Sequence, residues 1–152
     1  MLTHLPQTDA NKGRLFVAGF DNGIVRFCQV NSEGVEIMKA FKAHDESIIG
    51  VKFSADLKMC VTASTGGEIF FFEMDGHKDT QKYDPMCCLK LPDDSKINDF
   101  SWNTDDKSLV FGCKNGNVYQ IRRPEAKDVD NADSYEWVNP DISTWTIKIM
   151  EF

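Results

Sequence analysis

The sequence predicts an all-β fold made of antiparallel four-stranded units that repeat along the chain. Segments 17–30, 62–74 and 111–123 align with one another, and each holds a short apolar strand, a tight turn that ends in glycine, and an alternating strand. The turn glycines, Gly23, Gly67 and Gly116, are 44 and 49 residues apart, close to the roughly 40 to 45 residues of one propeller blade. The repeat therefore predicts about three blades of a β-propeller.

Period-two alternation fills the rest of each unit with strands. In the second unit it predicts a strand that ends at Phe53, a turn at 54–57, and a strand through Val61. The third unit repeats this order, with a strand that ends at Trp102 and a turn at 103–107. With one more strand in the tail, we expect about eleven strands, three of them in an incomplete first unit.

The segment GEIFFFEM distinguishes a propeller from a sandwich. Successive side chains alternate across a strand, so Ile69 and Phe71 point to one side while Phe70 and Phe72 point to the other. Both faces of this sheet must be covered. A sandwich sheet usually exposes one face to water, whereas a blade in a propeller is packed between its neighbours.

The units divide the chain without an internal linker. We expect an N-terminal extension at 1–12, blades at about 13–42, 43–92 and 93–152, and a long acidic surface loop at 124–140 inside the third. Nothing before Gly13 resembles a first strand, so the chain is expected to open on the second strand of a blade. Because a propeller needs about four blades or more to close, the prediction is a fragment of a larger propeller, completed by a longer chain or by a partner.

Composition favours a soluble protein of a reducing compartment. The 17 basic and 24 acidic residues give a net charge of −7, which opposes sequence-independent binding to a phosphate backbone. No apolar run is long enough to cross a membrane, and the first dozen residues lack a signal-peptide pattern. The five cysteines lie mostly in apolar runs, without C-x-x-C spacing, which indicates buried reduced thiols. We therefore expect a cytoplasmic protein with neither nucleic-acid nor membrane partners.

Catalytic and metal-binding patterns are weak. The histidines, His4, His44 and His77, lack nearby partners for chemistry, and Cys87 and Cys88 must point to opposite faces of one strand. The acidic run at 128–133 lacks the glycine and glutamate of a calcium loop. No phosphate-binding loop or nucleophile motif occurs. We expect no catalytic residue, no cofactor and no metal.

The second unit resembles a WD40 repeat. The residues that carry the resemblance are AHDESIIGVKFSAD, from Ala43, and VTASTGGEIFFFE, from Val61. The match is diverged, because Ala43 replaces a glycine, Gly66 stands at the turn aspartate, and Phe72 and Glu73 replace the Trp-Asp pair. The hydrogen-bonded His-Ser-Asp-Trp tetrad of the family is therefore expected to be incomplete. The resemblance assigns structural roles to Gly23, His44, Phe53, Ser54, Asp56, Ser64, Gly67, Phe72 and Gly116.

Within that family, the runs EIFFFEM and WTIKIMEF are similar to WD-repeat proteins associated with cilia and flagella. Such proteins are large axonemal tethers or scaffolds near the inner dynein arms. This resemblance implies a non-catalytic protein–protein scaffold in the axoneme, with dynein-associated or tether components as partners.

One rim of the predicted propeller carries the candidate binding surface. In WD40 propellers the loops that join successive blades share this rim with the turns between the second and third strands. Loops are polar for solvation alone, so a binding role and a merely structural one both stay open. We define the loop rim as Asp21, Asn22, Asp45, Glu46, Asp94, Lys96, Lys114 and Asn115.

Three alternatives remain beside the axonemal scaffold. The chain could be a general cytosolic WD40 adaptor, which localisation would distinguish. It could be a propeller enzyme with a site in the channel, in which case replacing His44 would abolish activity. It could also be a single closed β-sandwich that binds a ligand, which would melt cooperatively as a monomer.

Overall fold

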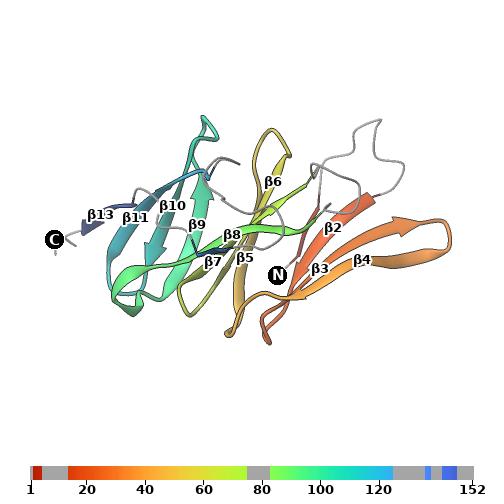
Figure 1. Ribbon diagram of the computed structural model, residues 1–152, viewed down its shortest axis with the longest axis horizontal. Helices are drawn as coiled ribbons and strands as arrows, with labels where there is room; N and C mark the ends of the chain where they lie inside the picture. The colour runs from red at the N-terminus through yellow and green to blue at the C-terminus, as the bar shows by residue number, and fades with distance from the viewer. Residues whose placement is uncertain (1, 5–13, 75–82, 125–135, 138–141, 147–152) are drawn as a thin grey trace, which may run out of the picture.

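The computed structural model describes residues 2–4, 14–74, 83–124, 136–137 and 142–146. Within these ranges the chain forms three β-sheets that stand side by side along its long axis (Figure 1). A single 3-10 turn, η2 (Pro92–Asp94), is the one helical element of the described residues. The all-β prediction is confirmed.

The sheets follow one another along the chain. Sheet 1 has the order β1 (Leu2–His4), β2 (Arg14–Gly19), β3 (Ile24–Asn31) and β4 (Gly34–Lys42). Sheet 2 has the order β5 (Ile48–Phe53), β6 (Met59–Ser64), β7 (Glu68–Glu73), β8 (Pro85–Lys90) and β12 (Glu136–Trp137). Sheet 3 has the order β9 (Ile97–Trp102), β10 (Ser108–Cys113), β11 (Asn117–Arg122) and β13 (Ile142–Thr146).

Each sheet is an antiparallel meander, as short tight turns between alternating strands require. The exception is β12, which lies parallel to β8 and pairs Glu136 with Cys87. The predicted strands that end at Phe53 and Trp102 are β5 and β9, and the predicted tail strand is β13. The sheets are thus three blades of a partial propeller.

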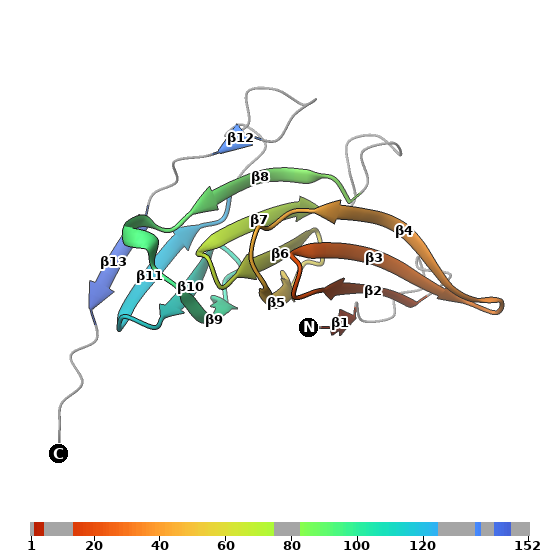
Figure 2. The same cartoon turned by 90° about the horizontal axis from the view of Figure 1, so that it is seen from below.

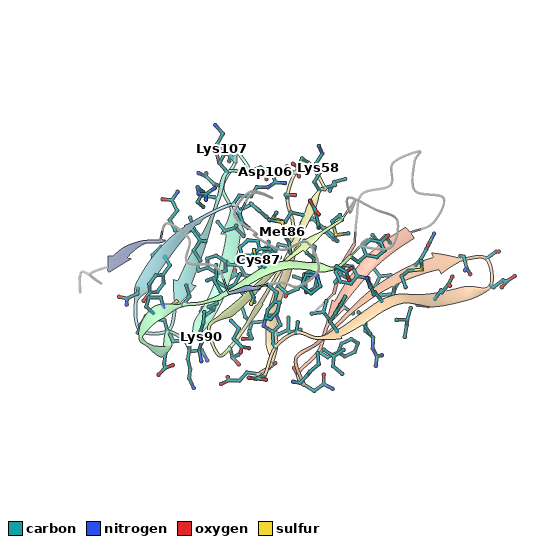
Figure 3. All side chains as sticks on the ribbon, in the orientation of Figure 1. Lys58, Met86, Cys87, Lys90, Asp106 and Lys107 are labelled. Atoms are coloured by element: carbon teal, nitrogen blue, oxygen red, sulfur yellow. The ribbon has the colours of Figure 1, made fainter. Side chains whose placement is uncertain are left out.

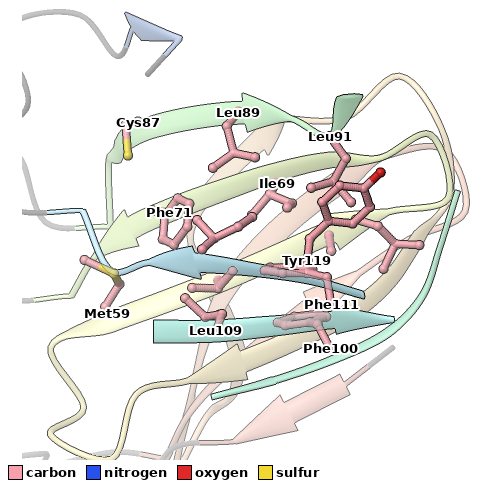
Figure 4. Packing of buried hydrophobic residues seen from close by; sticks show 14 residues of the cluster. Met59, Ile69, Phe71, Cys87, Leu89, Leu91, Phe100, Leu109, Phe111 and Tyr119 are labelled. Carbon is pink, nitrogen blue, oxygen red and sulfur yellow. The ribbon is translucent and has the colours of Figure 1, made fainter. Parts of the chain in front are cut away.

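Strand β7 is buried on both faces, as its sequence predicted. Ile69 and Phe71 belong to the core between sheets 2 and 3, which Figure 4 shows at close range. Phe70 and Phe72 belong to a second core, between sheets 1 and 2. None of these four side chains is more than 4% exposed. Sheet 2 is therefore the middle layer on which both neighbours pack.

The interpretation that the chain opens on the second strand of a blade was wrong. Strand β1 pairs with β2, from Leu2 opposite Ala18 to His4 opposite Phe16, and so takes the first-strand position. Three residues are too few to show a period-two pattern, so backbone pairing forms this strand without a readable signal. The same holds for the two-residue strand β12, within the segment 124–140 that we expected to be a loop. Residues 125–135 and 138–140 of that segment, which include the acidic run at 128–133, lie outside the described residues. His77 lies outside them as well.

All five cysteines are free thiols, four of them buried and Cys113 partly buried. Cys87 and Cys88 lie in opposite cores, as predicted from their adjacency. Burial, and secondarily the charge of Glu68, raises the pKa of the Cys88 thiol to about 11. The Cys88 thiol is therefore protonated at neutral pH and packs as a small apolar group.

The blade connections press closely on the turn glycines. Gly23 has a φ of 77°, and a Cβ atom at this position would lie 1.9 Å from the backbone oxygen of His44. The amide of His44 donates a hydrogen bond to the Gly23 carbonyl over 3.1 Å. At Gly67 a Cβ atom would lie 2.7 Å from the backbone oxygen of Ser95. The turn glycine of one blade thus leaves space for the backbone of the connection that leads into the next blade.

This contact predicts a large difference between two glycine substitutions. Gly23→Ala adds a backbone clash to left-handed strain, so we expect it to lower the free energy of unfolding by about 3 kcal/mol or more. Gly34→Ala is the matched control, since Gly34 also has positive φ but has open space around it. It should cost only about 1 to 2 kcal/mol. Urea denaturation of both variants measures the difference, and equal costs would contradict the role of the contact.

Candidate protein-interaction surface

Five connections lie together along one edge of the three sheets. They are the β2–β3, β6–β7 and β10–β11 turns and the β4–β5 and β8–β9 connections, in keeping with the meander. Figure 3 shows Lys90, at the end of β8, on this edge, and Lys58, Asp106 and Lys107 on the opposite one. The structure places all eight residues of the loop rim on the first edge, and all eight are exposed.

The rim residues of sheets 1 and 2 form an acidic end. The Ser47 hydroxyl donates to Asp21 over 2.9 Å, and the Thr65 hydroxyl donates to Glu46 over 2.8 Å. The Lys42 ammonium donates to the backbone oxygen of His44 over 2.6 Å and to that of Asn22. These hydrogen bonds join the neighbouring loops and so hold together the rim residues Asp21, Asn22, Asp45 and Glu46.

The rim residues of sheets 2 and 3 form a more basic end. The amide of Lys114 donates to the backbone oxygen of Lys96 over 2.9 Å, so these two residues are neighbours. Asn115 donates through its side chain to the Ser95 hydroxyl over 3.0 Å. Asp94 faces Lys90 at 3.9 Å, a pair too exposed to contribute much stability. The loop rim is therefore two separate groups, one acidic and one largely basic.

His44 lies buried beneath the acidic end, with 1% of its surface exposed. Its Nε2 atom is 2.7 Å from the hydroxyl oxygen of Thr62, and its ring meets that of Phe70 edge-on at 4.9 Å. Burial, and secondarily the charge of Lys42, lowers the pKa of His44 to about 4. The imidazole is therefore neutral at physiological pH, which suits a structural link between the connection and strand β6.

Glu68 stands close to the place of the missing turn aspartate. Its Oε2 atom lies 3.7 Å from His44 Nδ1 and accepts a hydrogen bond from the Asp45 amide over 3.0 Å. The Ser64 hydroxyl also donates to it over 3.3 Å. The sequence resemblance predicted a structural role for Ser64 but none for Thr62 or Glu68. Thr62 and Ser64 share one face of β6, so alternation alone could not tell which of them meets the histidine.

The third blade fills the equivalent place with different chemistry. The Ser95 hydroxyl lies 2.8 Å from that of Tyr119, and Asn117 donates to the same tyrosine oxygen over 3.2 Å. Ser95 and Tyr119 are buried. Gly116, by the Asn115 turn, has a φ of 84°. Each blade connection is thus anchored by a buried polar pair: His44 meets the hydroxyl of Thr62 and not that of Ser64, and the Ser95–Tyr119 pair contains no histidine.

The remaining WD40-like residues lie elsewhere. Phe72 is fully buried and packs edge-on against Phe27 at 5.2 Å, so an apolar ring occupies the tryptophan position. Phe53 packs at the edge of the same core. Ser54 donates to Asp56 over 2.6 Å in the β5–β6 turn, on the edge opposite the loop rim.

Charged side chains on that opposite edge line a hollow. Burial by itself would raise the pKa of Asp56, but hydrogen bonds from Ser54, the Lys58 amide and Arg123 lower it below its ordinary value. Arg123 also forms an ion pair with Asp56 at 3.0 Å. This ion pair joins sheets 2 and 3. The side chains that line the hollow are Asp56, Asp105, Asp106, Lys107, Arg122 and Arg123.

Within the described ranges, no three His, Cys, Asp or Glu side chains gather as metal ligands. The same part of the chain contains no helix of the length and apolarity needed to cross a bilayer.

Comparison with solved structures gives the fold. The chain superposes on the propeller domain of Cps50 (Swd1) from Myceliophteria thermophila with a TM-score of 0.60 at 11% identity, covering 72% of this chain and 34% of that one. It superposes on Saccharomyces cerevisiae Sqt1 with a TM-score of 0.65 at 15% identity, covering 88% and 32%. For Kluyvelomyces marxianus Hsv2 the TM-score is 0.59 at 16% identity, covering 90% and 40%. This chain is a partial WD40-type β-propeller.

Sequence comparison agrees with the narrower resemblance. The chain is 21% identical to mouse cilia- and flagella-associated protein 44 over 155 aligned residues, and 25% identical to the Chlamydomonas reinhardtii protein of that name over 131. These alignments cover 90% and 78% of this chain but only 8% and 7% of those proteins. No family model matches the sequence. The predicted resemblance to ciliary WD-repeat proteins is confirmed.

The neutral state of His44 predicts a pH dependence. Between its ordinary pKa of 6.5 and the folded value of about 4, the unfolded chain binds a proton that the folded chain excludes. Stability is therefore fully present above the upper pKa and is lost as the pH falls towards the lower one, by about 3 kcal/mol.

Urea titrations of the full chain at pH 7 and pH 4.5 measure this loss. In a His44→Gln variant, which cannot titrate, the loss over this interval should shrink by most of that amount. An equal loss in the variant and the natural chain would show that the histidine is not excluded from protonation.

Proposed function

We propose that this chain forms part of a non-catalytic protein-interaction scaffold of the ciliary or flagellar axoneme, with dynein-associated or tether components as its partners. The observation that carries the proposal is the loop rim, where charged side chains stand exposed on loops that are hydrogen-bonded to one another. The likeness to cilia- and flagella-associated protein 44 supports the axonemal location.

The mechanism is rigid display. The Ser47–Asp21 and Thr65–Glu46 hydrogen bonds fix two acidic side chains before a partner arrives. Binding then costs less side-chain and loop entropy than it would on free loops. The acidic end favours a basic segment of the partner and speeds its encounter, and this attraction weakens with salt.

A non-catalytic role is supported by the state of the titratable groups. His44 is buried and neutral and is used as a structural link. In the opposite hollow, Asp56 is held in an ion pair with Arg123. A general cytosolic adaptor is the second candidate, and localisation separates it from an axonemal scaffold.

The test is axonemal retention in a ciliated cell. We expect the tagged protein to sediment with demembranated axonemes, and an Asp45→Lys variant to be released at a lower salt concentration, because it reverses a charge at the acidic end. Asp105→Lys, the same change at an exposed residue of the opposite edge, is the matched control and should be released like the natural protein.

Two results would count against the proposal. Recovery of the natural protein entirely in the soluble fraction would favour the general adaptor. Equal release of the Asp45→Lys variant and the natural protein would move the interaction away from the loop rim while leaving the axonemal location intact.

A further inference from the structure

The outer edge of sheet 1 carries an unusual surface. The large apolar side chains that are exposed among the described residues all belong to sheet 1 or its turn, and three lie in β4: Val35 is 63% exposed, Ile37 53% and Met38 43%. In that same part of the chain β3 is the one strand that pairs with β4, so the other edge of β4 at residues 34–37 is open to strand pairing. Figure 2 shows the β3–β4 hairpin reaching past the end of β2.

Half of this edge lacks most of the usual protection against strand pairing. Proteins protect an exposed edge with charged side chains, lysine above all, or with proline, bulges or short strands. The C-terminal half of β4 has a bulge opposite Phe27 and Cys28, and carries Lys39 and Lys42. The N-terminal half, residues 34–37, has no lysine, proline or bulge, and Glu36 is its one charged side chain. This half of β4 is therefore a regular, largely apolar edge to which another strand can pair.

The faces of this half-strand follow from its register. Val35 lies opposite Val30 and Ile37 lies opposite Cys28, so both point to the face of sheet 1 away from Phe27 and sheet 2. Glu36 points to the other face and is exposed. An incoming strand would therefore meet two apolar side chains on one face and a carboxylate on the other.

Sheet 2 shows what occupies the corresponding edge. Its fourth strand, β8, has its outer edge covered by the extended strand β12, with Trp137 opposite Cys88. Strand β4 is the fourth strand of sheet 1, and the same edge is open there. The fold thus accommodates a fifth strand at this position, and the occupant it fits is an extended segment.

We propose that the edge of β4 at residues 34–37 binds an extended segment of another protein as a fifth strand of sheet 1. The segment places apolar side chains beside Val35 and Ile37 and a lysine or arginine opposite Glu36. Main-chain hydrogen bonds supply affinity and the alternating side chains supply specificity. This surface is separate from the loop rim and does not depend on the proposed function.

The test uses the full chain and a fluorescent probe, a capped pentapeptide of sequence TVRVT. We expect measurable binding by anisotropy, with a Kd below about 1 mM, and slower hydrogen exchange of the β4 amides. A peptide N-methylated at two successive residues cannot form the ladder and should not bind.

Variants of the chain locate the site. Ile37→Lys should weaken binding at least about tenfold, whereas Ala40→Lys, on the same face beyond the bulge, should change it less than about twofold. A TVEVT peptide should bind poorly, and Glu36→Lys should restore its binding. Circular dichroism verifies that each variant folds.

Several results would overturn the proposal. They are absence of binding, equal binding by the Ile37→Lys variant, and exchange protection at β8 instead of β4. A concentration-dependent dimer that Ile37→Lys dissolves would also overturn it, since a second copy of the chain would then cover the edge.

Discussion

The burial of β7 on both of its faces is the constraint on which the rest of the structure depends. Four successive apolar side chains, from Ile69 to Phe72, cannot be covered by one neighbouring layer. Fully burying each is worth about 1.5 to 3 kcal/mol, so leaving either face wet would remove much of the stability of a domain this size. Sheets 1 and 3 must therefore pack on opposite sides of sheet 2, and the meander sets their connections along its edges.

Once the sheets are stacked, each connection has to enter the next blade at a defined point. The two connections solve this with unlike side chains, the His44–Thr62 pair in one and the Ser95–Tyr119 pair in the other. The two pairs lie at the same position in the fold, because the backbone of His44 and that of Ser95 each contact the turn glycine of the preceding blade. A diverged WD40 repeat therefore keeps its geometry without the complete family tetrad, because unlike buried polar pairs can anchor the connection at the same point.

Features with a local signal could be predicted from the sequence, and features that depend on distant strands could not. Strands with a clear alternation, such as β5 and β7, and the polar turns between them were predictable, since their signal is local. The partner of His44 was not, because Thr62 and Ser64 lie on one face and only the distance across the blade decides between them. Strands β1 and β12 carry no period, and the exposure of β4 depends on which strands lie beside it. These features are set by tertiary pairing.

The two surfaces of the chain differ in their physics. The loop rim offers charges at fixed positions, whose attraction for a partner is screened within about 8 Å at physiological ionic strength. The edge of β4 offers mainly backbone groups and apolar side chains, whose interactions salt does not screen, with Glu36 as its one charged contact. A propeller that used both could be steered to its site by the rim and held there by the edge. Because the rim turns and the exposed edge lie on different elements, each contact can be lost while the other persists, and the salt dependence of attachment reports which one remains.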